Sequence, residues 1–510
     1  MSPRPGRGGE LRIAVVYPNS YWVAMSNLGY QTILRTFLER PGFDVRRVLW
    51  DGQNLHFPDG GRSLSEFDIV AFSVSYQPDM VHLPRMLEAG KVAVSSPPGN
   101  RPLVIGGGIA LTINPEPVSP FLDLIVIGDS EPVLPHLMDL FLSEGVDAEN
   151  LIQSASHLRG VYAPSMYSVP ETISSGYLMP VPVPGAPDKV NRAAVSSLDS
   201  NPARPAAVAR DTEFGSLYLL EISRGCPAGC SFCAASSVCG SVRFLGLEKF
   251  GEELALGLRY RKKIGLVGTA VSYHPQLLEI AQMVHEAGGT FSPSSIRLEK
   301  LTPRLADLLA VSEHKTVSLA PEAGTVDLRS AVGKGFPDED AFRAVDMLQD
   351  AGIPNVKLYF MVGLPGETDQ DVTAITGLVS DIRDRVVQAG RKRGKVGTVS
   401  VSVNPFIPKP HTPFERSPLA PEDVLTRRLK SVRDGLRKVG GVKVQTGSVR
   451  RAYLDALLSL GDRRLSGVLG HLPESGTSLK RLNRIVDGAS GILFEREEVK
   501  DLPWGFIGGS

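Results

Sequence analysis

The chain has 510 residues, of which 42% are hydrophobic, and its 55 lysines and arginines balance 55 aspartates and glutamates. This length suggests about three domains, and the zero net charge gives no electrostatic reason to expect a nucleic-acid partner. No apolar run reaches the ~18 residues of a transmembrane helix, so we expect a cytoplasmic protein without a membrane partner.

Residues 11–145 alternate short apolar runs with amphipathic segments. The runs are "LRIAVVYP", "DIVAFSVS", "PLVIGGG" and "DLIVIGD". Near-continuous apolar runs are typical of parallel strands that are covered on both faces. The segment therefore predicts a Rossmann-like, doubly wound sheet, in which a ligand binds beyond the carboxyl ends of the strands.

The rest of the chain predicts three further segments. Residues 146–213 are punctuated by Pro, Gly and Ser, which favours an extended linker with a few short strands. Residues 214–415 carry six candidate strands separated mostly by helical sequence: "SLYLLEIS", "KIGLVGTAV", "GTFSPSSIR", "HKTVSLAPE", "VKLYFMVGL" and "TVSVSVNPF". Six such units predict a partial (β/α)6 barrel of the TIM type, with its site at the carboxyl ends of the strands. Residues 416–510 read as a mostly helical C-terminal region, and the predicted fold class is α/β.

All four cysteines lie within fourteen residues, directly after the first barrel strand: Cys226, Cys230, Cys233 and Cys239. In a reducing compartment such a cluster indicates a metal site rather than disulfides. The thiolates of Cys226, Cys230 and Cys233 can bind three irons of a cubane 4Fe–4S cluster and leave the fourth iron open. The alternative is a zinc site of all four cysteines, but closed zinc sites usually pair C-x-x-C motifs. Cys239 is better explained as a small buried hydrophobe.

The spacing CxxxCxφC after the first strand of a partial barrel resembles the signature of the radical S-adenosylmethionine (radical SAM) superfamily. The resemblance implies that S-adenosylmethionine chelates the open iron and is cleaved by one electron to give a 5′-deoxyadenosyl radical. It also implies an electron donor such as flavodoxin or ferredoxin. The cofactors supply this chemistry, while the protein supplies ligation, positioning and exclusion of water.

The ends of the later barrel strands also resemble the superfamily's cofactor-binding positions. "APEAGT" resembles its E-x-G-S/T step, and "YFMVGLPGETDQDV" resembles its G-L-P-G-E-T turn. The resemblance implies contacts with the methionine, ribose and adenine parts of the cofactor. The residues concerned are Gly268, Thr269, Ser294, Ser295, Arg297, Glu322, Thr325, Gly363, Pro365, Gly366 and Glu367. No residue can be singled out as catalytic.

The first domain resembles the cobalamin-binding module that precedes the barrel in many radical SAM enzymes. The matching stretches are "MSNLGYQ", "FSVSY", "VIGGG" and "VIGDSE", and the implied ligand contacts are Ser26, Ser73, Ser75, Gly106, Gly107 and Gly108. One position departs from the pattern D-x-H-x-x-G, because alignment on Gly29 puts Ala24 at the aspartate and Ser26 at the histidine. We expect cobalamin binding without an axial imidazole, and the alternative is a vestigial module.

The resemblance implies a radical SAM enzyme of a largely uncharacterised bacterial branch. The expected reaction is methylation or rearrangement of an unactivated carbon, in a substrate that is a small molecule or unknown. A methylthiotransferase would need three more cysteines in the first domain, which has none. The alternative from another class is a non-catalytic iron–sulfur or zinc module.

Overall fold

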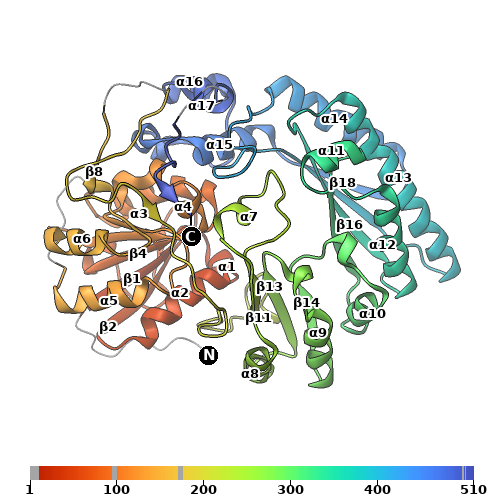
Figure 1. The fold of residues 1–510 in the computed structure, drawn as a ribbon, viewed down its shortest axis with the longest axis horizontal. Helices are drawn as coiled ribbons and strands as arrows, with labels where there is room; N and C mark the ends of the chain where they lie inside the picture. Colours follow the sequence, from red (N-terminus) through yellow and green to blue (C-terminus); the bar gives the residue numbers. More distant parts are fainter. Residues whose placement is uncertain are drawn as a thin grey trace. The chain divides into compact units, whose positions relative to one another are not determined.

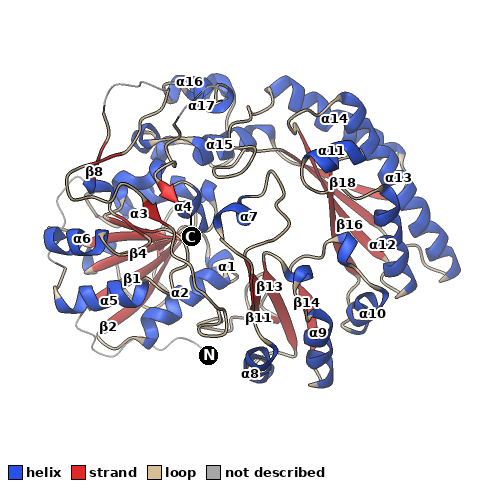
Figure 2. Cartoon of the chain, in the orientation of Figure 1, coloured by secondary structure: helices blue, strands red, loops and turns tan. Residues whose placement is uncertain are grey.

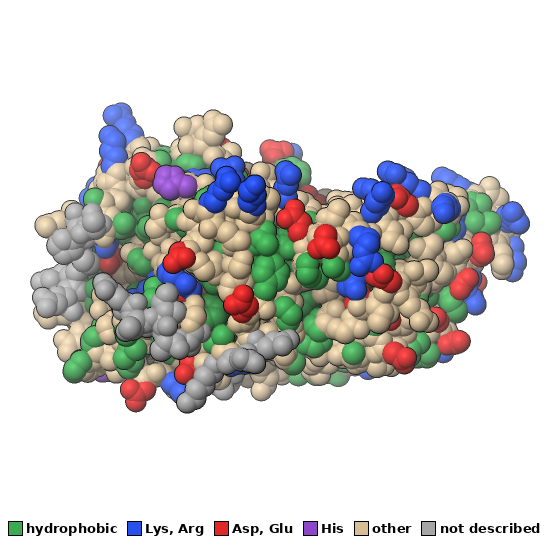
Figure 3. Space-filling model, turned by 90° about the horizontal axis from the view of Figure 1, so that it is seen from above, with side chains coloured by type: hydrophobic (Ala, Val, Ile, Leu, Met, Phe, Trp, Pro, Cys, Tyr) green, Lys and Arg blue, Asp and Glu red, His purple; other side chains and the backbone are tan. Residues whose placement is uncertain are grey.

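The computed structural model describes residues 11–94, 100–146, 148–170, 176–496, 499 and 501–509. The chain divides into two compact units. The first comprises residues 1–216, 238–240 and 454–510, and the second comprises residues 217–237 and 241–453. Among the described residues, no helix combines the length and the apolar character needed to cross a membrane. On the face shown in Figure 3, basic and acidic side chains are interspersed.

The first unit is built on a seven-stranded sheet with the order β3-β2-β1-β4-β5-β6-β7. The five inner strands run parallel and the two edge strands are antiparallel to their neighbours. The strands are β1 (Leu11–Tyr17), β2 (Phe43–Trp50), β3 (Leu55–His56), β4 (Ile69–Ser73), β5 (Leu103–Gly107), β6 (Leu124–Val126) and β7 (Val161–Tyr162). The chain passes from β1 to β2 on one side and later enters β4 on the other side, so the topological switch point lies between β1 and β4.

Helices cover both faces of this sheet (Figures 1 and 2). The apolar side chains of α2 and α5 pack with alternate residues of the strands in one buried cluster. The helices of this part are α1 (Tyr21–Ala24), α2 (Leu28–Glu39), α3 (His82–Ala89), α4 (Ile109–Ile113), α5 (Leu134–Ser143) and α6 (Ala148–Ser156). Residues 161–191 add the short strands β8 (Tyr167–Ser168), β9 (Val181–Pro182) and β10 (Val190–Asn191).

The C-terminal segment completes the first unit. It contains the greater part of α15 (Val449–Leu460), followed by α16 (Leu479–Ile485), α17 (Ala489–Phe494) and β19 (Ile507–Gly508), which pairs in parallel with β10. In Figure 1 this blue segment lies against the red and orange start of the same unit. The Asn114 amide donates to the carbonyls of Ser459 (3.0 Å) and Gly461 (2.8 Å). Residues 454–510 therefore group with residues 1–216, a different division from the separate region predicted for 416–510.

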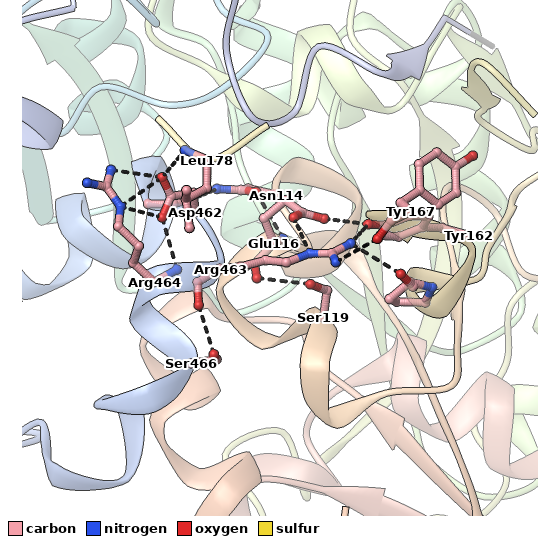
Figure 4. Close-up of polar contacts among 12 residues, drawn as sticks. Asn114, Glu116, Ser119, Tyr162, Tyr167, Leu178, Asp462, Arg463, Arg464 and Ser466 are labelled. Atoms are coloured by element: carbon pink, nitrogen blue, oxygen red, sulfur yellow. Dashed lines mark hydrogen bonds and ion pairs between the residues drawn. The ribbon is translucent and has the colours of Figure 1, made fainter. Parts of the chain in front are cut away.

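A buried polar cluster fastens the C-terminal segment to the first part of the unit (Figure 4). The Arg463 guanidinium donates to Glu116 Oε2 (2.8 Å) and to the Tyr162 hydroxyl, which itself donates to Glu116 Oε1 (2.6 Å). Asp462 accepts from the backbone N–H of Leu178 and from the Arg464 guanidinium, each at 2.8 Å. Glu116, Tyr162 and Asp462 are fully buried, so each charge is matched by a partner, as burial requires.

The second unit is the partial barrel that the sequence predicts. Its parallel strands form two four-stranded sheets, β12-β11-β13-β14 and β15-β16-β17-β18, with only β12 antiparallel. The strands are β11 (Leu217–Arg224), β12 (Arg243–Phe244), β13 (Lys263–Gly268), β14 (Thr290–Pro293), β15 (Thr316–Glu322), β16 (Asn355–Val362), β17 (Val399–Pro405) and β18 (Val442–Thr446). All six predicted strands are present. β18, at 442–446, adds a seventh parallel strand within the region that the sequence analysis reads as helical.

Helices follow the strands of the second unit, and α12, α13 and α14 lie beside the sheet β15–β18 (Figure 2). The helices are α7 (Ala234–Val238), α8 (Leu247–Leu258), α9 (Leu277–Glu286), α10 (Pro303–Val311), α11 (Val326–Ala331), α12 (Asp338–Asp350), α13 (Asp369–Lys392) and α14 (Glu422–Lys438). The chain also forms 3-10 helices: η1 (Leu64–Glu66), η2 (Gln77–Val81), η3 (Glu116–Phe121), η4 (Pro164–Met166), η5 (Val271–Tyr273), η6 (Leu298–Lys300), η7 (Arg463–Gly467) and η8 (Leu469–His471).

Candidate functional site

The three cysteines of the CxxxCxφC motif lie on one tight loop at the carboxyl end of β11. Glycines allow the loop to turn, since Gly225 has φ +80° and Gly229 has φ +63°. The Cys233 N–H donates to the Cys230 carbonyl (3.1 Å). Cys230 is buried, whereas Cys226 and Cys233 are partly exposed. The loop therefore presents three thiols from one short stretch of backbone.

A segment between α11 and α12 holds this loop from behind. The Ser231 N–H donates to the Val332 carbonyl (3.1 Å), and the Cys230 thiol lies 3.9 Å from the Gly333 carbonyl oxygen. A Cβ at position 333 would lie 3.2 Å from the Cys230 Cα, and φ there is +78°. Position 333 therefore requires glycine both for its backbone conformation and for the close approach of the cysteine loop.

The cysteines fit an iron–sulfur cluster better than a single zinc ion. Among the residues that the structure describes, no three His, Cys, Asp or Glu side chains gather closely enough to hold one metal ion. A cubane spreads its thiolate ligands over separate irons, whereas zinc needs its ligands around one centre. Cys239 is partly exposed rather than buried as expected. It groups with the first unit, and the other three cysteines group with the second.

The ends of β13 and β14 support the cysteine loop. A Cβ at Gly268 would lie 2.5 Å from a backbone oxygen of β11, so this glycine serves strand packing. The Thr269 hydroxyl donates to the Gly225 carbonyl (2.7 Å), directly before the first cysteine. The Ser294 hydroxyl donates to the Gly268 carbonyl (3.2 Å), and Ser294 and Ser295 are exposed. The predicted residues are therefore close to the loop, and Thr269, Ser294 and Ser295 are exposed.

Arg297 contacts the cysteine loop directly. Its Nη1 lies 3.4 Å from the Cys230 Sγ, and its Nε pairs with Glu299. Its guanidinium lies 5.6 Å from the Tyr273 ring centroid. The resemblance implies a contact between this side chain and S-adenosylmethionine, and the structure places its guanidinium beside the Cys230 sulfur.

Glu322 and Lys334 form an ion pair near the same loop. Lys334 Nζ donates to Glu322 Oε1 (2.7 Å) and to the Ala320 carbonyl (2.9 Å). It also lies 6.0 Å from the ring centroid of Phe232, the residue before Cys233. Burial raises the pKa of the Glu322 carboxyl, while Lys334 acts to lower it. Lys334 was not predicted. It begins the dipeptide "KG", which follows α11, the helix after the fourth predicted barrel strand, and this position could have drawn attention to it.

Glu322 also carries an unusual backbone. Its φ is +71°, a region that L-residues other than glycine rarely adopt. The register between β15 and β16 shifts between Leu319 and Glu322. Backbone outliers of this kind gather at functional sites, where the surroundings enforce them. The outlier therefore adds to the reasons for placing a ligand at the end of β15.

Thr325 acts as the N-cap of α11. Its hydroxyl accepts from the Leu328 N–H (3.3 Å) and donates to Asp371, the residue that also forms the capping box of α13. The structure thus assigns the Thr325 side chain to joining two helix starts.

The turn after β16 is closed by its own glutamate. The Gly363 N–H (2.6 Å) and the Arg428 guanidinium (2.7 Å) both donate to Glu367 Oε2. Burial raises the pKa of Glu367 to about 7, although the Gly363 N–H and Arg428 act to lower it. Gly366 is exposed with φ +76°, and Pro365 is partly exposed. Only Pro365 and Gly366 of this turn are therefore accessible to a ligand.

In the first unit, the glycine-rich turn after β5 is packed by the chain itself. A Cβ at Gly106 would lie 2.7 Å from a methyl group of Leu122, and one at Gly108 would lie 2.4 Å from the Val74 carbonyl oxygen. Gly107 is the register partner of Ser73 on β4. Gly106 and Gly108 therefore allow close packing of the sheet, so a ligand is not needed to explain them, whereas a Cβ at Gly107 would make only an ordinary contact with Val126 (3.5 Å).

The predicted serines of the first unit take different roles. The Ser26 hydroxyl donates to the Trp22 carbonyl (2.6 Å) and accepts from the Glu213 N–H (3.0 Å), so it braces a loop. Ser73 is buried at the end of β4. Ser75 hydrogen-bonds the phenol of Tyr17 at the end of β1. Of the three, Ser75 lies at the switch point between β1 and β4.

Large apolar side chains are exposed on the segments that follow β1, β4 and β5, which include the short helices α1 and α4. Trp22 is 49% exposed, Tyr76 43%, Val23 38% and Ile109 37%. The Trp22 indole is held in place because its Nε1–H donates to Glu213 Oε2 (3.3 Å). These side chains line the carboxyl edge of neighbouring strands, where doubly wound sheets bind their ligands. A ligand with a broad apolar surface fits such an edge.

Comparisons with known proteins agree with this architecture. Residues 35–164 match the family of N-terminal domains of radical SAM proteins, and residues 220–379 match the radical SAM superfamily. An uncharacterised protein of Methanocaldococcus jannaschii is 26% identical over 480 residues, which cover 93% of this chain and 95% of that one. The tRNA-2-methylthio-N(6)-dimethylallyladenosine synthase of Methylacidiphilum infernorum is 27% identical over 39% of this chain and 46% of its own.

Among solved structures, the cobalamin-dependent S-adenosylmethionine radical enzyme OxsB with aqua-cobalamin bound has a similar fold. The TM-score is 0.50 at 14% sequence identity, and the match covers 72% of this chain and about half (52%) of OxsB. The two family matches fall on the two predicted α/β domains, and the cysteine loop lies at the carboxyl end of the first barrel strand. The chain is therefore a protein of the radical SAM superfamily, with an N-terminal domain that matches the N-terminal domains of radical SAM proteins.

Proposed function

We propose that this radical SAM enzyme uses cobalamin together with S-adenosylmethionine to methylate or rearrange an unactivated carbon of its substrate. The observation that carries the proposal is the loop of Cys226, Cys230 and Cys233 at the carboxyl end of β11, braced by Val332 and Gly333. When bound, the cluster and S-adenosylmethionine supply a 5′-deoxyadenosyl radical and methionine through transfer of one electron to the sulfonium.

The residues around the loop suit the cofactor that the family implies. The three cysteines would hold the cluster. Glu322 and Lys334 offer a carboxylate and an ammonium side by side, which suits the charged amino-acid end of S-adenosylmethionine. Phe232, Phe414 and Met361 pack on the small apolar cluster around Phe406, and they can exclude water from the radical.

Two features of the first unit support the cobalamin part of the proposal. The first is the exposed apolar edge formed by Trp22, Val23, Tyr76 and Ile109 at the carboxyl ends of the strands. It suits the apolar face of a corrin macrocycle bound at the switch point. The second is the similarity in fold to OxsB. Because Ala24 and Ser26 replace the aspartate and histidine of the D-x-H-x-x-G pattern, the corrin would bind without an axial imidazole from this loop.

The proposal extends to the partners. The substrate is proposed to be a small molecule, and a flavodoxin or ferredoxin would supply the electron. The methylthiotransferase relatives match only part of this chain, and residues 1–216 contain no cysteine for a second cluster. Methylthiolation is therefore not proposed.

The test is anaerobic reconstitution with iron, sulfide and hydroxocobalamin, followed by assays for bound corrinoid and for 5′-deoxyadenosine. We expect a corrinoid absorption band that stays with the protein, and 5′-deoxyadenosine on addition of S-adenosylmethionine and a reductant. Cleavage without bound corrinoid would indicate a vestigial first domain. A cluster without cleavage would indicate a non-catalytic iron–sulfur module.

A variant series tests the proposed corrin surface. We expect Trp22→Ala to weaken corrinoid binding about tenfold, measured by visible absorption, because losing the apolar contact of the indole should cost about 1.4 kcal/mol. Val181→Ala is the control, because Val181 is also exposed in the first unit but lies on the short strand β9. Equal binding by both variants and the unmodified protein would place the corrinoid elsewhere.

A further inference from the structure

Arg297 is anchored beside one cysteine of the loop. Its Nη1 lies within hydrogen-bond distance of the Cys230 sulfur, at 3.4 Å. The Glu299 carboxylate pairs with its Nε, and the Arg297 backbone N–H donates to Ser272 Oγ (2.9 Å). The side chains of Arg297 and Glu299 are 18% and 25% exposed. The guanidinium is therefore a partly buried, anchored positive charge beside one particular cysteine.

The cysteine that Arg297 contacts is the least exposed of the three. Cys230 is 6% exposed, while Cys226 and Cys233 are partly exposed. Water can stabilise negative charge at the two accessible sulfurs, but it reaches the Cys230 sulfur much less. A hydrogen bond from a cationic donor is stronger than one from a neutral donor and compensates for this lost solvation. Arg297 thus stands in for solvent at Cys230.

A positive charge at this position favours the reduced cluster. Reduction of a cubane held by three thiolates adds one electron and therefore one negative charge. Cluster potentials depend on net charge, on hydrogen bonds to the sulfurs and on exposure to solvent. With a cluster bound, the N–H···S contact of Arg297 would stabilise the more negative, reduced form and would raise the potential. The negative charge of the Glu299 carboxylate, which pairs with the Arg297 guanidinium, offsets part of this effect.

We propose that Arg297 is a positioning residue for the cluster, and that the Arg297–Glu299 pair sets the cluster's midpoint potential. The inference rests on the proposed function, because it requires a 4Fe–4S cluster on Cys226, Cys230 and Cys233. It goes beyond that proposal, since the family resemblance implies that Arg297 contacts S-adenosylmethionine, whereas here Arg297 acts on the cluster. The electron still comes from the external donor, and no covalent bond forms or breaks at Arg297.

The experiment is an anaerobic redox titration without S-adenosylmethionine, in which the reduced cluster is followed by EPR spectroscopy. We expect Arg297→Gln to shift the midpoint potential to more negative values, because a positive charge and a donor to sulfur are lost. Glu299→Gln should shift it in the opposite direction, because a negative charge is lost while the guanidinium stays. Arg297→Lys keeps the charge, and its potential should lie between those of Arg297→Gln and the unmodified protein.

Two controls separate this inference from other effects. Arg304→Gln removes an exposed charge on α10 and should leave the potential unchanged. Iron and sulfide content is measured for every variant. If Arg297→Gln does not retain the cluster, the shift in midpoint potential of Glu299→Gln decides whether the inference holds. Equal potentials in the unmodified protein and in each variant that retains the full cluster would overturn the inference, whereas an unmodified protein that binds no cluster would overturn the proposed function instead.

Discussion

Replacing Arg463 by methionine should destabilise the first unit strongly. The Arg463 guanidinium pairs with the Glu116 carboxylate, which is fully buried on η3 (Figure 4). After the replacement, the Tyr162 hydroxyl, at 2.6 Å, would be the one side chain among the described residues that still donates to this carboxylate. Removing one partner of a buried ion pair typically costs about 3–5 kcal/mol, because the remaining charge is uncompensated. We therefore expect a loss of this size in the free energy of unfolding of the first unit.

The loss should depend on pH. Burial raises the pKa of the Glu116 carboxyl, and Arg463 acts to lower it. Without Arg463 the folded-state pKa rises further above the unfolded value of about 4.5. A carboxyl whose pKa is higher in the folded state than in the unfolded state does not lower the free energy of unfolding at pH values below its unfolded-state pKa. The free energy of unfolding falls as the pH rises from the unfolded-state pKa through the folded-state pKa. The difference between the unmodified protein and Arg463→Met should therefore widen as pH rises above about 4.5.

The assay is urea unfolding followed by tryptophan fluorescence. All three tryptophans, Trp22, Trp50 and Trp504, belong to the first unit, so the signal reports on that unit. A chain with two units need not unfold in a single transition. Because all the tryptophans lie in the first unit, their fluorescence distinguishes the unfolding of the first unit from that of the second.

A double-mutant cycle and a surface control complete the design. Glu116→Gln combined with Arg463→Met removes both charges, so its loss should be smaller than the sum of the two single losses. Arg40→Met breaks the exposed pair with Asp139 in the same unit and should cost about 0–1 kcal/mol. An unchanged unfolding midpoint for Arg463→Met, or additive single losses in the cycle, would refute this account of the buried cluster.

Two further predictions concern the second unit. Gly333→Ala should lower iron content after reconstitution, because its Cβ would press on Cys230 from 3.2 Å at φ +78°; Gly352→Ala, with φ +86° and open space around it, should leave iron content unchanged. Burial raises the pKa of Glu367 to about 7 despite Arg428. As pH rises from 4.5 to 7, Glu367→Gln should therefore gain stability relative to the unmodified protein, by up to about 3 kcal/mol. Hydrogen exchange of α13 and α14 would measure this difference, and a difference that does not change with pH would contradict the prediction.

The sequence predicted the barrel strands and the first-unit strands with continuous apolar runs, because burial on both faces leaves that pattern. It missed β2, whose run "FDVRRVLW" is interrupted by charges. One of them, Arg47, is buried in an ion pair with Asp59, 12 positions away, with Nε 2.7 Å from Oδ2. A charge that is neutralised by a distant residue cannot be told from a solvent-exposed charge in the sequence alone.

The grouping of residues 454–510 with the first unit was beyond sequence reasoning for a similar reason. The segment is held by contacts between positions about 345 residues apart, such as Asn114 with Ser459 and Glu116 with Arg463. Neither Asn114 nor Glu116 belongs to a motif, and helical periodicity does not indicate which neighbour a helix packs against. The segment was therefore predicted as helical without a partner.

Within the site, the cysteine spacing was informative because cluster ligation needs that residue type at that spacing. The roles of Thr325, Glu367 and Arg297 were not, because polar residues at strand ends serve equally as caps, turn closures and ligands. In the structure Thr325 caps the start of a helix, and Glu367 closes a turn. Arg297 lies beside the Cys230 sulfur. Lys334 was missed since it reaches Glu322 from the far end of the following helix.

The most direct measurement is the iron and sulfide content of anaerobically reconstituted cysteine variants. We expect alanine at Cys226, Cys230 or Cys233 to abolish the 4Fe–4S cluster and 5′-deoxyadenosine formation, and Cys239→Ala to retain both. Full iron and sulfide content in any of the first three variants would contradict the claim that these three thiolates hold the cluster.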